Sequence, residues 1–226
     1  MTGRGWVGRP VRRLEDPAIL RGEGAYVDNL RLPGMAHMVA VRSPLAHARL
    51  VGVDTAAARR APGVLAVLTG DDLVGLVGRM PLLPIEGAEV ADVPIPLLAT
   101  GRVRFAGEPV AVVAATTRAA AADAAELVEA DYDPLPVLVD PHQALGAVRL
   151  HDHLDGNVLL RWRRRHGDVD GAFAAAARVV RGRFRMPRLV ASPSEPRGAV
   201  AAHDPAGDLL TLWLSAQDPH RPLRQL

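Results

Sequence analysis

The stretch EPVAVVAATTRAAAADAAELVEADYDPLPVLVD, residues 108–140, decides the class of fold. Its first part, EPVAVVAAT (108–116), is a short run of apolar residues of the kind that forms a buried strand. The next part, TRAAAADAAELVEADY (117–132), is rich in alanine and opens on threonine, so it predicts a capped helix. LPVLVD (135–140) predicts another strand. A strand, a helix and a strand in this order predict a compact α/β unit that ends near residue 142.

The residues before this stretch continue the alternation of strand and helix. Residues 35–53 contain two short apolar runs that flank the turn sequence SPLAH. Asp54 or Thr55 can cap a short helix after them, and VLAVLTG (64–70) predicts a buried strand followed by a short helix that opens on aspartate. Four prolines, Pro81, Pro84, Pro94 and Pro96, predict an irregular excursion over residues 78–101.

The C-terminal third predicts loops, one short helix and paired strands. Residues 142–166 are loop-like, and DVDGAFAAA (168–176) predicts a helix capped by Asp168. The alternation of apolar residues with arginine predicts a strand over 180–186. The runs GAVAAHD and DLLTLWLSAQ flank DPAGD and predict a β-hairpin. A period of two would place Gln217 on the same face as Thr211, Trp213 and Ser215.

The composition excludes several kinds of chemistry. Cysteine is absent, which excludes disulfides, thiolate zinc sites, a cysteine nucleophile and iron–sulfur ligation by this chain. The N-terminal residues contain no apolar signal region, and no run approaches the length of a membrane span. A soluble cytoplasmic protein without a membrane span is therefore the expectation.

The charge pattern does not indicate nucleic-acid binding. All 27 basic residues are arginine, and 25 acidic residues leave a net charge of +2. WRRR at 162–165 is the single dense basic run, and beyond Trp162 no aromatic residues are interleaved with it. We therefore expect no nucleic-acid partner.

Local patterns provide few catalytic candidates. GRGWVG (3–8) matches a dinucleotide-binding pattern, but no strand precedes it. His151 and His153 could share a metal, yet they are interpreted as loop histidines because no third ligand stands out. Glu195 and Arg197 suit hydrogen bonds or an ion pair at the entrance of a strand. The four serines lack both the sequence setting of a nucleophile and an evident histidine partner: Ser43, Ser192, Ser194 and Ser215.

Several stretches, taken together and in order, resemble the molybdopterin-binding large subunit of the xanthine dehydrogenase family. They include APGVLAVLTGDDL, VRFAGEPVAVVAATTRAAAADAAELVEADYDPLP, GDVDGAFAAAARVVRGRF, EPRGAVAAHDP and LWLSAQDPH. The resemblance is strongest to the large subunits of aerobic carbon monoxide dehydrogenase and of aldehyde oxidoreductases, and it runs from about Val7 to His220. Ser194 stands where methionine is common in the family's PMEPRG motif.

The resemblance implies an α/β (α+β) fold in three parts. Residues 14–142 would form the aldehyde oxidase/xanthine dehydrogenase α/β hammerhead domain, 143–165 a linker, and 166–226 the truncated start of the molybdenum-cofactor-binding domain. The implied cofactor of the complete enzyme is molybdenum–molybdopterin cytosine dinucleotide, and we expect this chain alone to bind none. Gln217 matches the family glutamine that hydrogen-bonds an oxo ligand of molybdenum, and it is the one cofactor-binding residue carried over.

The resemblance also implies an activity and partners. Such enzymes oxidise aldehydes, N-heterocycles or carbon monoxide, with water as the source of oxygen. The implied partners are the remaining part of the large subunit, an FAD-binding medium subunit and a 2Fe–2S small subunit. The family's GGGFG loop and its glutamate base would lie beyond Leu226, so we expect a fragment or split subunit that is inactive alone. The alternative is a free-standing hammerhead module that scaffolds partner subunits without catalysis.

Overall fold

The chain forms two compact units. The computed structural model describes residues 5–80, 82, 84–93, 95–146, 148–218 and 220–225. The larger unit contains Gly34–Arg183, and the smaller joins the N-terminal residues up to Pro33 with Phe184–Arg224. The domain boundaries expected from the sequence, 14–142, 143–165 and 166–226, remain a prediction.

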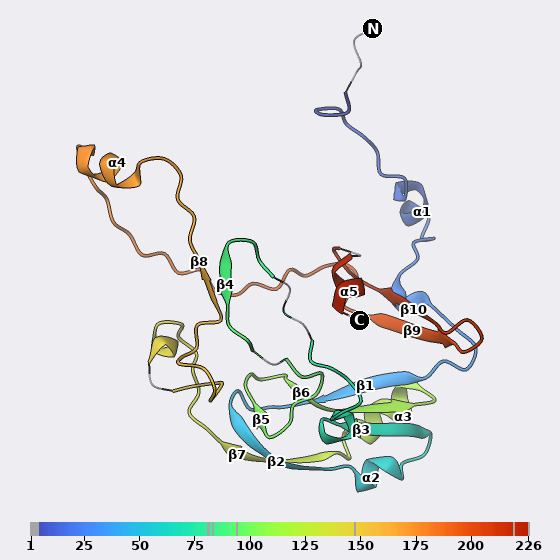
Figure 1. The fold of residues 1–226 in the computed structure, drawn as a ribbon. Coiled ribbons are helices and arrows are strands. Elements are labelled where there is room, and N and C mark those ends of the chain that lie inside the picture. The colour runs from blue at the N-terminus through green and yellow to red at the C-terminus, as the bar shows by residue number, and fades with distance from the viewer. Residues whose placement is uncertain are drawn as a thin grey trace. The chain divides into compact units, whose positions relative to one another are not determined.

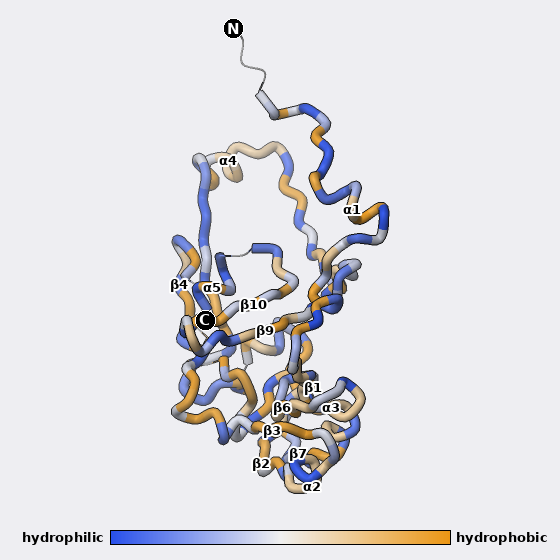
Figure 2. Tube along the Cα trace, turned by 90° about the vertical axis from the view of Figure 1, so that its right-hand side faces the viewer, coloured by the Kyte–Doolittle hydropathy of each residue, from blue (hydrophilic) through white to orange (hydrophobic). Residues whose placement is uncertain are grey.

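The core of the larger unit is built on one central strand. β6 (Pro109–Ala115) lies between β1 (His37–Arg42) and β3 (Val64–Thr69), and both pairings are antiparallel. The three strands lie side by side in Figure 1. Because β6 has neighbours on both edges and packing on both faces, its residues can be apolar almost without alternation. Figure 2 shows this hydrophobic character along β3 and β6.

Helices cover one face of this sheet. α3 (Arg118–Ala125) packs against β1 and β6, and α2 (Ala56–Arg59) packs against β3. The side chain of Thr117 caps α3 by accepting a hydrogen bond from Ala120 N at 3.1 Å, as expected for threonine at a helix start. Between the helices and the sheet lies a cluster of fully buried side chains: Ala58, Val67, Val113 and Ala124.

A second sheet packs on the other side of β6. Its strands have the order β5 (Arg102–Val103), β2 (Ala48–Asp54) and β7 (Glu129–Pro134), again antiparallel. Val110 and Val113 lie three residues apart on β6, so their side chains point to opposite faces of the strand. Val113 faces the cluster under the helices, and Val110 faces the second sheet. Val110 joins the second buried cluster together with Ala48, Ala99 and Val103.

One predicted strand was misplaced. The structure has no strand at 135–140; the strand is β7 (Glu129–Pro134), and α3 ends at Ala125 rather than continuing to residue 132. The physical reason is tertiary pairing. Ala130 and Tyr132 alternate toward the buried cluster while β7 pairs with β2, and this period of two is hidden in a segment that continues an alanine-rich helix pattern.

The irregular part of the larger unit contains a strand pair that the sequence did not predict. β4 (Ala88–Val90) pairs with β8 (Leu160–Trp162), so segments about seventy residues apart are joined. The short helix expected at 168–176 is confirmed as α4 (Val169–Ala175), with Asp168 accepting from Gly171 N. Two short 3₁₀ helices complete the unit: η2 (Asp71–Leu73) and η3 (Gln143–Leu145). Pro81 and Pro94, part of the predicted excursion, lie outside the described residues.

The strand predicted over 180–186 is absent from the structure. These residues have no regular secondary structure and are exposed, with Phe184 and Met186 each 92% accessible. Alternating side chains suit a strand, but a strand also needs a neighbour for its backbone hydrogen bonds. Among the described residues, none pairs with this segment.

The smaller unit is built on the predicted hairpin. β9 (Ala199–Asp204) and β10 (Leu209–Leu214) pair antiparallel around the DPAGD turn, which confirms the prediction (Figure 1). Asp208 adopts a left-handed conformation, φ 47°, at the end of this turn. The remaining elements of the smaller unit are α1 (Asp16–Leu20), η1 (Val27–Asn29) and α5 (His220–Gln225). None of the helices in the described ranges is long and apolar enough to cross a lipid bilayer.

Candidate functional site

Gln217 lies just beyond the end of β10. The strand ends at Leu214, and Gln217 occupies an exposed bend before α5. The alternation of faces along the strand therefore does not extend to Gln217, and its direction cannot be deduced from a period of two. In the part of the chain that the structure describes, no hydrogen bond holds its side-chain amide.

Two side chains fix the backbone on either side of this bend. Ser215 Oγ accepts from Gly198 N at 3.1 Å and donates to Pro196 O at 3.2 Å. Asp218 Oδ1 accepts from His220 N at 2.9 Å, which ties the other side of the bend to the start of α5. The hydrogen bonds of Ser215 and Asp218 thus fix the backbone on both sides of Gln217.

Glu195 makes a structural hydrogen bond, as expected from the sequence, but its partner is distant in the sequence rather than local. Its Oε1 accepts a hydrogen bond from Val27 N at 3.0 Å, across 168 residues of sequence. A Cβ at position 198 would lie 3.3 Å from Val27 Cγ1, so Gly198 lets the two segments approach closely. The EPRG segment, residues 195–198, therefore joins the N-terminal part of the smaller unit to its hairpin.

His151 and His153 belong to a packed loop in the larger unit. Their ring centroids are 5.9 Å apart in an edge-on arrangement, and His153 Nε2 contacts Asp92 O at 2.8 Å. Between them, Asp152 makes a bidentate ion pair with Arg102 at 2.9 Å, and this contact lowers the pKa of the Asp152 carboxyl. The described residues contain no cluster of three or more side chains able to hold a metal. The loop position predicted for both histidines is confirmed.

This loop gives the stability of the chain a pH dependence. Burial, followed by the charges of Arg104, His153 and Arg102, lowers the pKa of His151 below its usual 6.5, and Asp152 only partly opposes this. Between pH 6.5 and the lowered pKa, the unfolded chain binds a proton that the folded chain does not. The contribution of His151 to the free energy of unfolding should therefore fall as the pH falls through this window.

The measurement is thermal unfolding from pH 8 to pH 5 of the wild type and of His151→Gln. Comparing both proteins first at pH 8, where the histidine is neutral in both states, separates lost packing from titration. We expect the variant to lose less stability on acidification. An equal or steeper loss in His151→Gln would contradict the assignment.

The other candidates have structural roles or lie in open loops. Ser43 is buried, and its hydroxyl bonds both Leu45 N and Leu45 O. Ser192 and Ser194 are exposed in a segment without regular structure. The GRGWVG stretch lies partly outside the described residues, and its described part, from Gly5 on, contains no strand. The geometry therefore assigns no serine nucleophile.

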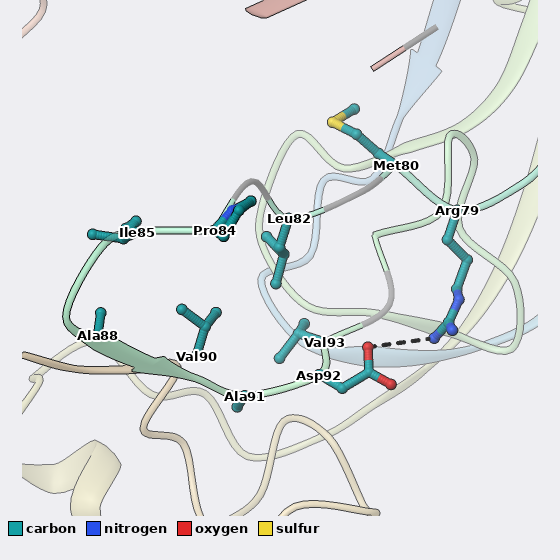
Figure 3. Close-up of a pocket in the computed structure, with 10 residues that line it drawn as sticks. All are labelled: Arg79, Met80, Leu82, Pro84, Ile85, Ala88, Val90, Ala91, Asp92 and Val93. Carbon is teal, nitrogen blue, oxygen red and sulfur yellow. Dashed lines mark ion pairs between the residues drawn. The ribbon is translucent and has the colours of Figure 1, made fainter. Parts of the chain in front are cut away.

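The larger unit also has a wide concavity of about 550 Å³, lined by ten described residues between Arg79 and Val93. Figure 3 shows apolar side chains such as Leu82 and Val90 around it, with an Arg79–Asp92 ion pair of 3.8 Å at one end. Arg79 and Asp92 are the charged side chains among its described lining residues, and they pair with each other.

Two family models match the chain in succession. Residues 21–136 match the model described as "Aldehyde oxidase and xanthine dehydrogenase, a/b hammerhead domain". Residues 150–226 match the "Molybdopterin cofactor-binding domain". Residues 21–136 therefore belong to the hammerhead class of folds, and the mixed helices and antiparallel strands agree with the α/β (α+β) class expected from the sequence.

Curated relatives and solved structures agree with these models. The large subunit of nicotine 6-hydroxylase from Paenarthrobacter nicotinovorans is 40% identical over 96% of this chain and 27% of its own length. The carbon monoxide dehydrogenase large chain of Afipia carboxidovorans is 39% identical over 92% of this chain and 27% of its own. The crystal structure of quinoline 2-oxidoreductase from Pseudomonas putida superposes with a TM-score of 0.81, at 42% identity, over 92% of this chain and 27% of that one.

These matches confirm the resemblance seen in the sequence. The chain belongs to the aldehyde oxidase and xanthine dehydrogenase family, and its relatives include the large subunits of nicotine 6-hydroxylase and of carbon monoxide dehydrogenase. It spans about 27% of the length of these relatives. The role of Gln217 as a cofactor contact remains a prediction.

Proposed function

We propose that the chain forms part of the large subunit of a molybdenum hydroxylase, an oxidoreductase that uses water as its source of oxygen. The observation that carries the proposal is the succession of a hammerhead domain over 21–136 and a molybdopterin cofactor-binding domain from residue 150. The substrate class is an aldehyde, an N-heterocycle or carbon monoxide. Nicotine and quinoline in the names of two relatives make an N-heterocycle the first to test.

The side chain of Gln217 fits a contact with the cofactor. A neutral amide offers two N–H donors and adds no charge, and this one is exposed and makes no hydrogen bond within the described ranges. A molybdenum–molybdopterin cytosine dinucleotide would supply two-electron redox chemistry when bound. Gln217 would donate to an oxo ligand and hold it in place. Since one amide cannot bind such a cofactor stably, we propose that the 226 residues alone are inactive and retain none.

The reaction requires partners that accept electrons. Hydroxylation of a substrate R–H by water gives R–OH, two protons and two electrons, so two electrons must leave the large subunit. Without cysteine, these 226 residues cannot ligate an iron–sulfur cluster through thiolates. We therefore propose a 2Fe–2S subunit and an FAD subunit as partners, along with the remaining part of the large subunit. The cytoplasmic location expected from the sequence stays a prediction.

The test is to purify the complex that contains this chain and to measure its metal and its product. We expect about one molybdenum per large subunit, which occupies one cofactor-binding domain. In H₂¹⁸O, a hydroxylated N-heterocycle from nicotine or quinoline should carry the heavy oxygen. A complex with neither molybdenum nor turnover on N-heterocycles, aldehydes and carbon monoxide would contradict the proposal and favour the scaffolding module.

A further inference from the structure

Ser215 makes three hydrogen bonds to the EPRG segment. Its backbone N donates to Gly198 O at 3.1 Å, which extends the β9–β10 ladder by one residue. Its hydroxyl accepts from Gly198 N and donates to Pro196 O. A hydroxyl is both donor and acceptor, and here both capacities are used on the same short segment.

The EPRG segment is itself anchored. Glu195 accepts from Val27 N, and Gly198 packs against the Val27 side chain. The segment that Ser215 contacts is therefore itself held in place. Ser215 connects the end of β10 to a segment that is tied to η1 within the same unit.

On its other side, the bend is held by Asp218. With Asp218 Oδ1 bonded to His220 N, only Ala216 and Gln217 lie between the two anchored residues. The Gln217 side chain makes no hydrogen bond of its own in the part of the chain described here. The held backbone therefore fixes the position of Gln217 Cα and the direction of its Cα–Cβ bond, from which the side chain extends.

From this geometry we infer that Ser215 is a positioning residue for the proposed reaction: its hydroxyl fixes the exit of β10 and thereby the place from which the Gln217 side chain reaches the cofactor. The inference rests on the proposed function, since it assigns Gln217 the contact to the cofactor. Small misplacements of an oriented donor are costly for catalysis because its hydrogen bond must already be aligned when the reaction begins. The EPRG segment thereby gains a role beyond packing.

The experiment compares four single variants and one double variant in the holoenzyme at equal molybdenum content. Ser215→Ala removes the hydroxyl, and Ser215→Thr keeps it on a side chain that suits an extended backbone. Thr211→Ala is the matched control, because it removes an exposed hydroxyl from the same strand. Gln217→Ala, alone and combined with Ser215→Ala, tests whether the two residues act together.

The first readout, amide hydrogen exchange by mass spectrometry, is independent of activity. Ser215→Ala should speed exchange about threefold or more in peptides that contain Gly198 and residues 215–218, because Gly198 N loses its acceptor. Ser215→Thr and Thr211→Ala should exchange like the wild type. Unchanged exchange in Ser215→Ala would overturn the inference whatever the function.

The second readout is turnover. Ser215→Ala should lower kcat about ten- to a hundredfold with little change in KM, and Ser215→Thr should restore it. In the Gln217→Ala background, removal of the hydroxyl should cost nothing further. An additive loss, or no loss while Gln217→Ala is impaired, would overturn the positioning role and leave the proposed function intact. Full activity in Gln217→Ala would overturn both the cofactor contact and the positioning role. In that case, faster amide exchange in Ser215→Ala would still show that the Ser215 hydroxyl holds the end of β10.

Discussion

Replacing Gln217 with alanine in the complete enzyme should lower turnover by about ten- to a thousandfold, equivalent to about 1.4 to 4 kcal/mol of transition-state stabilisation. The physical reason is the loss of one preorganised N–H donor at the proposed molybdenum oxo ligand. Stability should change by less than about 0.5 kcal/mol, because the side chain is exposed. The measurement is kcat with molybdenum content held equal, beside a melting curve.

Two further variants make this result specific. Gln217→Glu keeps the shape of the side chain but replaces the N–H donor by a negative charge, so it should be at least as impaired as alanine. Gln143→Ala removes another exposed glutamine, at the start of η3 in the larger unit, and should retain full turnover. If Gln217→Ala were as active as Gln143→Ala, the cofactor contact would have to be abandoned.

The local elements of the fold could be predicted where one pattern dominates. The buried strand around Val113, the start of the alanine-rich helix at Thr117 and the hairpin around DPAGD agree with the structure, although the helix ends at Ala125. In each case the sequence period and the capping or turn residues indicate the same element. Such agreement makes a local prediction reliable.

Errors arose where distant segments decide the structure. β7 forms at 129–134 because Ala130 and Tyr132 meet the cluster around Ala48, which no local pattern reveals. The pairing of β4 with β8 likewise depends on the partner strand rather than on its own three residues. Conversely, residues 180–186 carry a strand pattern and remain unpaired among the described residues. Strand propensity describes a surface that can pair, and the partner decides whether it does.

The candidate site likewise contains residues whose roles only the folded structure reveals. Gln217 was found through its family resemblance, since a lone glutamine after a strand has no local signature. The roles of Ser215 and Glu195 depend on contacts with Gly198 and Val27 that only the folded chain brings together. The signal that could have pointed to them was the EPRG sequence before the hairpin, whose glycine permits close approach of a second segment.

The fold of the larger unit also depends on one glycine with almost no space around it. Gly70 is buried between β3 and η2, and a Cβ there would lie 2.5 Å from Thr100 Cγ2 and 2.7 Å from Ala99 O. Ala99 cannot move freely, because it is 2% exposed and its N donates to Pro109 O at 2.8 Å. Relief of the clash would therefore disturb the start of β6, the central strand.

We accordingly expect Gly70→Ala to lower the free energy of unfolding by about 1 to 3 kcal/mol, as overpacking of a filled site does. For a chain of this length, the melting temperature should fall by about 2 to 12 °C. Gly78→Ala is the matched control, since nothing lies within 4 Å of a Cβ at that position and its φ is not positive. There, a less flexible unfolded chain should leave stability unchanged or raise it by up to about 1 kcal/mol. The two glycines thus predict opposite signs for the same substitution, which thermal unfolding followed by circular dichroism can measure directly. Equal melting temperatures for both variants would mean that the Ala99 backbone yields without cost and that β6 tolerates the displacement.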